Sequence, residues 1–200
     1  MTFHIPITLL FNRDGYRISA EEKLPFKTNR ATLESLYEEL KINYPRFFKM
    51  DFLCKSVFLA AEYMVQKMGN LNPHCAVVLS TSHGSLDSDH LFHTSLKSIP
   101  SPSHFVYTLP NIMIGELSIR HTLRGESALF VTPHFNPELL LNYAQTLGGQ
   151  VLCGWANVVE DCPEVFLFLL QTAAVDSNKR STFIDANVNY LKQMYNGNYQ

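Results

Sequence analysis

The 200-residue sequence has few cysteines and almost no net charge. It has four cysteines, with no Cys-x-x-Cys pair and no evident disulfide spacing, so reduced thiols buried among apolar neighbours are expected at Cys54, Cys75, Cys153 and Cys162. Sixteen Lys and Arg residues against eighteen Asp and Glu residues give a net charge of −2. A charge this small attracts neither nucleic acid nor an anionic membrane surface, so we expect neither as a partner.

Long apolar runs are also absent. The first run, "HIPITLLF", ends at Asn12-Arg13-Asp14 and has no basic segment before it, which predicts neither a signal peptide nor a membrane span. We therefore expect a cytoplasmic protein. No Pro/Gly/Ser-rich linker divides the sequence, and 46% hydrophobic residues suffice for a sizeable core, so residues 1–200 are predicted to form one domain.

Strand-like runs alternate with segments that have helical spacing of apolar residues. Residues 13–29 are expected to be polar and irregular, and 98–105 to form an ordered surface loop. The predicted strands are 4–11, 75–82, 127–132, 150–159 and 164–173; the predicted helices are 31–44, 49–69, 88–96, 110–123, a helix from 137, and 181–195.

Several residues mark where these helices begin and end. Asp87 or Ser88 is expected to cap the helix 88–96, Pro110 to lie in the first turn of the next, and Asn136 to cap the helix that Pro137 begins. Residues 165–170 are apolar on both faces, which is typical of a strand in the middle of a covered sheet.

The alternation predicts an α/β domain with a mixed, mostly parallel sheet and helices on its faces, ending in an antiparallel hairpin formed by the last two strands. The order of four segments is also informative: "KMDFLCKSVFLAAEYM", "VVLSTSHGSLDSDHLF", "SPSHFVYTLPNIMIGELSIRHTLRGESALFVT" and "VLCGWANVVED". From about residue 46 to 161 this order resembles the N-terminal half of the β-ketoacyl-ACP synthases, the condensing enzymes of fatty-acid and polyketide synthesis.

The positions that carry the resemblance are Met50-Asp51, residues 81–84, Pro110-Asn111, Gly115 and Gly125. The resemblance implies a β-ketoacyl-synthase N-terminal-like domain with a thiolase-like half-fold, a role in acyl-chain elongation, and an acyl carrier protein in the pathway. A length near 200 residues also resembles the short ketosynthase-like proteins of bacterial pigment and aryl-polyene pathways.

Two departures from the family pattern bear on catalysis. The catalytic cysteine of the family, which follows a strand and begins a helix, falls on His134 in "VTPHFNPE". The C-terminal half of the family, which brings two further catalytic residues, lies outside this sequence. The resemblance therefore implies a retained frame without the condensing residues.

Histidine at this place does not replace a cysteine chemically. The positive end of a helix dipole disfavours a charged ring, so imidazole at position 134 is expected to be neutral, and an acyl-imidazole is too short-lived to hold a growing chain. His134 is more simply a histidine that fills a turn. Its alternative role is a general base for thioester hydrolysis, with Asn111 as a pocket residue that donates to the oxyanion.

Other nucleophiles and ligands are expected to be structural. Ser85 lies in no Gly-x-Ser-x-Gly motif, and Cys54 and Cys153 lie in apolar segments that blunt thiol reactivity. His90 and His93 share a helical face near two aspartates, but no third ligand is fixed. We predict neither a metal nor a cofactor.

An aromatic cluster leaves two interpretations open, core packing or the lining of an acyl channel. Gly115, inside a predicted helix, is expected to allow the close approach of another backbone, and His83-Gly84 to lie in a loop that the family places near its dimer interface. The aromatic residues are Phe47, Phe48, Phe52, Phe58, Phe105 and Tyr107.

The leading hypothesis is a non-catalytic ketosynthase-like subunit, comparable to a chain-length factor, that forms a homodimer or a heterodimer with a full ketosynthase. In the family the strand before the cysteine pairs across the dimer axis, so residues 127–132 are the expected interface. The alternatives are an acyl-thioester hydrolase or acyltransferase that uses His134, and a module that binds an acyl chain or acyl carrier protein.

Overall fold

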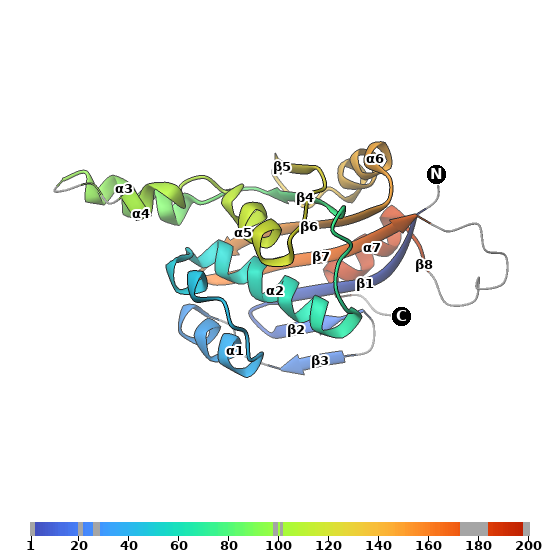
Figure 1. Ribbon diagram of the computed structural model, residues 1–200, viewed down its shortest axis with the longest axis horizontal. Coiled ribbons are helices and arrows are strands. Elements are labelled where there is room, and N and C mark those ends of the chain that lie inside the picture. The colour runs from blue at the N-terminus through green and yellow to red at the C-terminus, as the bar shows by residue number, and fades with distance from the viewer. Residues whose placement is uncertain are drawn as a thin grey trace.

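One mixed sheet organises the computed structural model, which describes residues 3–19, 22–25, 29–97, 100, 102–172 and 184–197 (Figure 1). The strand order is β3-β2-β1-β7-β6-β4-β5, and β8 adds to one end of β1. The strands are β1 (Phe3–Asn12), β2 (Gly15–Ile18), β3 (Glu22–Pro25), β4 (Ala76–Thr81), β5 (Ser127–Val131), β6 (Gln150–Val159), β7 (Cys162–Thr172) and β8 (Ile184–Asp185).

Helices cover both faces of the sheet, as expected for the α/β class. On one face α1, α2 and α5 enclose the larger core, and on the other α6 and α7 enclose the second. Among the described residues no helix has the length and apolarity to cross a membrane. The helices are α1 (Leu33–Glu39), α2 (Phe52–Met68), α3 (Leu86–Ser95), α4 (Pro102–Val106), α5 (Ile112–His121), α6 (Pro137–Leu147) and α7 (Val188–Asn196), with 3₁₀ turns at Arg30–Thr32 and Pro45–Lys49.

The β6–β7 hairpin lies at the centre of the sheet. Every residue from 165 to 170 is fully buried, because both faces of β7 are covered, which confirms the prediction from its apolar run. The antiparallel pairing is also confirmed, but the connection is only Glu160-Asp161. Both residues have positive φ, 48° and 60°, as a two-residue hairpin turn requires.

Parallel pairing is less extensive than expected. Only β5-β4-β6 is parallel in the described sheet, and the pairs β1-β2, β2-β3, β1-β7, β1-β8 and β6-β7 are antiparallel. The expectation that 13–29 is irregular is wrong, since it contains β2 and β3. β3 is the edge strand and β2 lies between β3 and β1, and each has only four residues, so the sequence pattern that marks a buried strand is weak there.

Helix boundaries differ from the predictions where local signals compete. α3 begins at Leu86 with Ser85 in the cap position, α5 begins at Ile112 after Asn111 rather than at Pro110, and α7 begins at Val188 with Asn187 as its cap. The expected loop 98–105 contains the short helix α4, and the predicted helix start at 181–183 lies outside the described residues.

Helices α2 and α5 are joined by an ion pair between the buried Glu62 and the half-buried Arg120. Arg120 on α5 donates to both carboxylate oxygens of Glu62 on α2, at 2.8 and 2.9 Å, and His121 Nε2 lies 3.1 Å from Glu62 Oε1. Burial alone raises the pKa of Glu62, but the neighbouring His121 and Arg120 outweigh it and the net pKa is lowered. Stability therefore depends on the charged form of Glu62.

Glu62→Gln is expected to lower the free energy of unfolding by about 3 kcal/mol at pH 6, because it leaves Arg120 without its carboxylate partner. The folded-state pKa of Glu62 lies below its unfolded value, so this contribution is present above about pH 4.3 and is lost as the pH falls through the folded-state value. Urea unfolding at pH 6 and pH 3 measures the difference. The control Glu38→Gln, on the exposed face of α1, should change stability by less than about 0.5 kcal/mol; equal effects of the two variants would contradict this assignment.

Candidate functional site

Three segments meet where the parallel strands end. Val131 of β5 lies opposite Thr81 of β4, and Ser80 of β4 lies opposite Trp155 of β6. The backbone N–H of Thr132 continues the ladder by donating to Thr81 O at 2.9 Å. The turn after β5, the loop after β4 and the end of β6 therefore lie together at the carboxyl ends of the parallel strands, where ligands of open α/β sheets usually bind.

The turn after β5 has the predicted strand–turn–helix form. Asn136 Oδ1 accepts from Leu139 N at 3.1 Å, and Pro137 is the first residue of α6, which confirms both expected roles. Phe135 is buried against Phe166 and Tyr195 and so anchors the turn to the sheet.

His134 lies on the outer side of this turn and is exposed. Its carbonyl oxygen accepts from Thr132 Oγ1 at 3.0 Å. Among the described residues its imidazole makes no hydrogen bond, so nothing there orients it as a catalytic base. Its part in catalysis remains a hypothesis.

The loop after β4 packs against the start of α5. Gly84 has a φ of +58°, and its N–H donates to Thr81 Oγ1 at 3.1 Å. A Cβ at Gly84 would lie 3.3 Å from Pro110 Cγ, so Pro110 abuts the loop. Asn111 follows, exposed and without a capping hydrogen bond from its side chain. No hydrogen bond joins Asn111 to His134 in the part of the chain described.

A pocket of about 270 Å³ lies between this loop and the end of β6. Asp51, which caps α2, accepts from Cys54 N and from Ser88 Oγ, both at 2.9 Å, and burial raises the pKa of its carboxyl group. The pocket is lined by Asp51, Leu53, His83, Gly84, Ser85, Leu86, Asp87, Asn157, Val158 and Glu160. Sequence reasoning missed Asn157, although a lone amide in the apolar strand "VLCGWANVV" was a usable signal.

The residues expected to be structural are distributed as follows. Ser85 is buried at the start of α3 and reaches the pocket wall. Burial raises the pKa of the Cys54 and Cys153 thiols well above the usual value, and that of Cys75 to about 11. The expectation of burial is wrong for Cys162, which is partly exposed and whose Sγ accepts from Arg13 Nε at 3.3 Å.

The remaining candidate residues, His90, His93 and Gly115, do not lie at the site described above. His90 and His93 are exposed on α3, and no group of three or more possible metal ligands occurs among the described residues. A Cβ at Gly115 would meet nothing within 4 Å, so none of the described residues makes the expected close backbone approach. Gly125 is the tight position instead, since a Cβ there would lie 2.4 Å from Cys75 O.

The aromatic cluster is divided between core and surface. Phe47, Phe52 and Phe58 are buried in the core over α2, and Phe47 stacks on Tyr37 at 4.4 Å between ring centroids. Phe48 and Phe105 are about half exposed, and none of the cluster lines the two pockets described here. Core packing therefore accounts for its buried members.

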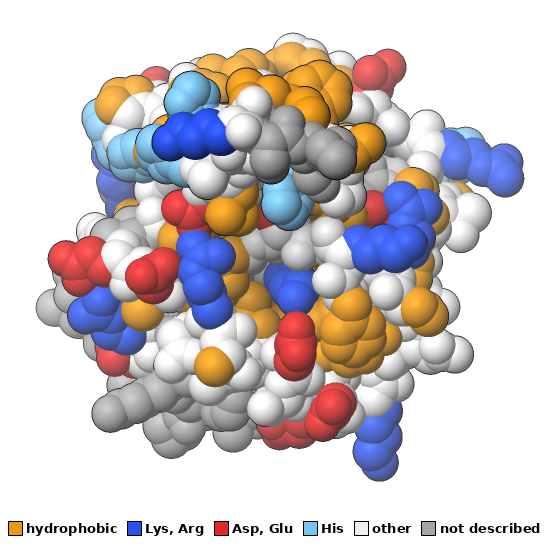
Figure 2. Space-filling model, turned by 90° about the vertical axis from the view of Figure 1, so that its left-hand side faces the viewer, with side chains coloured by type: hydrophobic (Ala, Val, Ile, Leu, Met, Phe, Trp, Pro, Cys, Tyr) orange, Lys and Arg blue, Asp and Glu red, His pale blue; other side chains and the backbone are white. Residues whose placement is uncertain are grey.

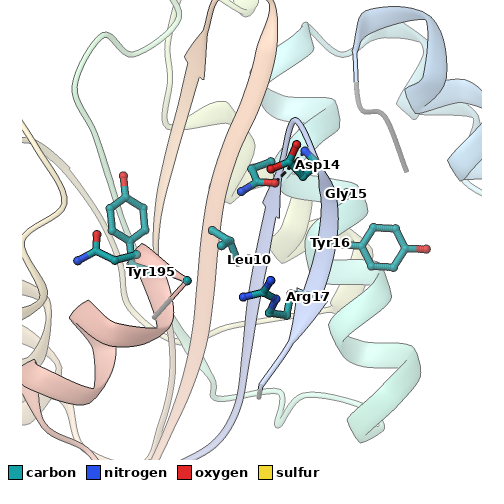
Figure 3. A pocket seen from close by; sticks show the side chains of 9 residues that line it. Leu10, Asp14, Gly15, Tyr16, Arg17 and Tyr195 are labelled. Carbon is teal, nitrogen blue, oxygen red and sulfur yellow. Dashed lines mark hydrogen bonds between the residues drawn. The ribbon is translucent and has the colours of Figure 1, made fainter. Parts of the chain in front are cut away.

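A second pocket, of about 190 Å³, lies between the β1–β2 turn and the end of α7 (Figure 3). Two of its polar side chains are already engaged: Asn12 Oδ1 accepts from Asp14 N at 3.0 Å, and Tyr195 OH donates to Glu164 Oε1 at 2.9 Å. The Tyr16 side chain points away from the space, toward α2, where it contacts Tyr63. We assign no function to this pocket.

Comparison with known proteins shows the fold. No protein-family model matches the sequence, and no curated protein matches it. Solved structures do match. A chain of the ketosynthase ApeO in complex with its chain length factor ApeC, from Xenorhabdus doucetiae, is 13% identical, with a TM-score of 0.59 over 88% of this chain and 81% of that chain. The chain has the ketosynthase fold.

Two further structures show the same ketosynthase fold. The ishigamide ketosynthase/chain length factor matches with 16% identity and a TM-score of 0.63, over 88% of this chain and 64% of its own. The complex AntDE:AntF, a type II polyketide synthase acyl-carrier protein with its ketosynthase bound to the hexaketide, matches with 12% identity and a TM-score of 0.60. There the match covers 85% of this chain and 62% of that chain, so this sequence spans less than two thirds of the length of both.

The position of His134 predicts how a thiol would behave there. In His134→Cys, the introduced thiol should react with iodoacetamide at least 10-fold faster than the buried Cys54, Cys75 and Cys153, because it is exposed just before a helix N-terminus that favours thiolate. Mass spectrometry of alkylated peptides over time measures the rates. Asn142→Cys, exposed in the middle of α6, is the matched control; equal rates at the two positions would show that the turn does not activate a thiol.

Proposed function

We propose that this chain is a non-catalytic ketosynthase-like subunit that pairs through β5 with a full ketosynthase or with a second copy of itself. The edge of β5 carries this proposal. β5 is the last strand in the order, so one of its sides has no strand partner among the described residues, and Val131 on it is 70% exposed. Natural sheets rarely leave such an apolar edge open to water.

Further apolar surface lies on α3 and α4, which we call the arm. The arm projects from the end of the sheet, at the left of Figure 1. Figure 2 views the molecule from that side and shows hydrophobic and histidine side chains gathered at the top. Six of the nine exposed large hydrophobic side chains described lie on or just after the arm: Leu86, Leu91, Leu96, Phe105, Val106 and Leu109. Such a concentration is typical of a protein–protein interface.

The fold closes its second face with its own C-terminal helix. Leu191 and Met194 of α7 are buried beside α6 against a core that includes Phe3, Phe166 and Phe168. The chain therefore covers both faces of its sheet with its own helices. This supports our further proposal that residues 1–200 act as one domain that binds a partner through an edge rather than a face.

Loss of the catalytic residue supports a non-catalytic role. His134 stands where the resemblance places the cysteine of the ketosynthases, and in the described residues no second catalytic group reaches it. The neighbouring structures contain ketosynthase–chain length factor and ketosynthase–acyl carrier protein complexes. By analogy we infer a cytoplasmic role in fatty-acid, polyketide or aryl-polyene synthesis, with an acyl carrier protein in the same pathway.

Val131→Lys should convert the oligomer to a monomer, because a charge on an edge strand prevents further strand pairing. Size-exclusion chromatography with light scattering at micromolar concentration measures the mass, for the chain alone and after co-expression with the ketosynthase encoded nearest to it. Ile119→Lys, at a similarly exposed apolar position on α5, should leave the mass unchanged. A monomer in both preparations of the unmodified chain would overturn the proposal.

A separate assay addresses the hydrolase alternative. The unmodified chain should release no free thiol from acyl-thioesters above the buffer rate, because the described residues give the His134 imidazole no orienting partner. Thiol release is followed with a chromogenic disulfide reagent. Turnover that persists through purification and disappears in His134→Ala would show that the chain is an enzyme and would contradict the non-catalytic assignment.

A further inference from the structure

The arm of α3 and α4 is attached to the rest of the chain at its base (Figure 1). Among the described residues, neither hydrophobic core includes a side chain of α3 or α4. Ser88, in the first turn of α3, is the only buried residue that the structure describes in the two helices. Beyond the base the helices pack on each other, with the ring centroids of Phe92 and Phe105 5.3 Å apart. The direction of the arm therefore depends on the contacts at its base.

One contact at the base is buried. Ser88 Oγ donates to Asp51 Oδ2 at 2.9 Å, and the other carboxylate oxygen of Asp51 accepts from Cys54 N in the first turn of α2. Ser88 is 3% exposed, so salt in the solvent screens this hydrogen bond only weakly. The first turn of α3 is thus joined at one point to the N-terminus of α2.

The second contact is ionic and lies at the surface. The Arg30 guanidinium binds the Asp87 carboxylate, and the two side chains are 46% and 48% exposed, so salt can screen this pair. Arg30 is also held by the body of the protein. Its Nε donates to Asp161 Oδ1 at 3.1 Å in the β6–β7 turn, and its guanidinium carbon lies 4.6 Å from the centroid of the Phe52 ring. Arg30 therefore ties the first turn of α3 to α2 and to the sheet.

The backbone at Arg30 is fixed independently of the arm. Asn29 Oδ1 accepts from Ala31 N, and Asn29 N donates to Thr32 Oγ1, each at 2.9 Å, so the 3₁₀ turn has a complete capping box. The planar guanidinium can then donate to two carboxylates at once. A single exposed ion pair contributes little, but here two ion pairs and a ring contact hold one side chain.

We propose that the Ser88–Asp51 hydrogen bond is a pivot for the arm and that Arg30 is the latch that sets the angle of the arm to the sheet. With the latch closed, the arm takes the direction seen in Figure 1. When salt screens the exposed pair, or when the charge of Arg30 or Asp87 is removed, the arm turns about Ser88 and takes other directions. Gly84, with a φ of +58°, lies just before the pivot, where the chain can absorb such a turn.

The latch decides where the exposed apolar side chains of the arm point. It thereby fixes the direction in which the arm meets a partner, and this consequence rests on the proposed function. The orientation of the arm within a single chain does not rest on it. The test therefore uses the Val131→Lys chain, which is expected to be a monomer, so that no second copy holds the arm.

Residual dipolar couplings of the backbone amides, measured for the ¹⁵N-labelled Val131→Lys chain in a stretched neutral gel, report the orientation of α3 relative to the sheet. At low salt the couplings of α3 should fit the same alignment tensor as those of β1, β6 and β7. Arg30→Met keeps an apolar side chain over Phe52 but removes the charge. It should reduce the α3 couplings at least about 2-fold, without abolishing them because Ser88 stays attached, and should leave the sheet couplings unchanged. Sodium chloride at about 1 M should have the same effect on the chain that keeps Arg30 and none on Arg30→Met.

Asp89→Asn is the matched control for Asp87→Asn. Both aspartates are exposed in the first turn of α3, so both substitutions remove the same favourable charge from the helix N-terminus. Only Asp87 binds Arg30, and no ion pair joins Asp89 to a described residue. Asp87→Asn should therefore reduce the α3 couplings as Arg30→Met does, and Asp89→Asn should not. Because Arg30 and Asp87 act through one contact, the combined variant should show no more than the larger single effect.

Unchanged α3 couplings in Arg30→Met would overturn the proposal, as would equal effects of Asp87→Asn and Asp89→Asn, or the same response to salt with and without Arg30. Light scattering of the same samples gives their mass. A paired mass for the Val131→Lys chain would contradict pairing through β5 and not the latch, so the two proposals fail separately.

Discussion

The burial of β7 on both faces is the constraint on which the rest of the structure depends. A strand whose residues 165–170 are all inaccessible to water requires a helical layer on each side, and the chain supplies α1, α2 and α5 on one and α6 and α7 on the other. Gly154 allows the hairpin to close, since a Cβ there would lie 2.5 Å from Phe166 O. The hairpin partner of β7 then pairs with β4 and positions the parallel strands.

That arrangement places the candidate functional residues at the carboxyl ends of the parallel strands. β5, β4 and β6 run parallel, so their carboxyl ends bring the His134 turn, the His83-Gly84 loop and Asn157 to the same side of the sheet. Two separate features lie at these strand ends: the turn is exposed and anchored by Phe135, and the pocket lined by Asp51 and Asn157 is partly enclosed. The turn after β5 thus has the strand–turn–helix form, and the pocket is lined by polar groups of other segments.

Polar groups buried away from these strand ends hold the helices together. Glu62 on α2 binds Arg120 on α5. Glu116 on α5 accepts from Tyr44 and Arg46, at 2.8 Å each, and both glutamates are buried. Residues far apart in the sequence make these contacts, and no periodic pattern reports them. The same holds for Asp51, whose bond to Ser88 connects the starts of α2 and α3.

Local patterns in the sequence determined the elements with strong signals: the two-sided apolar strand at 165–170, the long helix that Asp51 caps, and the β5–α6 turn with Asn136 and Pro137. The likeness of segment order to the ketosynthases also predicted the fold. Only the tertiary structure decided that β2 and β3 extend the sheet, that most strand pairs are antiparallel, and that Asn157, which lines the same pocket as Asp51, has a buried amide oxygen with no partner among the described residues. The physical reason is that helix caps and apolar runs act over a few residues, whereas edge pairing and the meeting of polar side chains depend on which distant segments the packed sheet brings together.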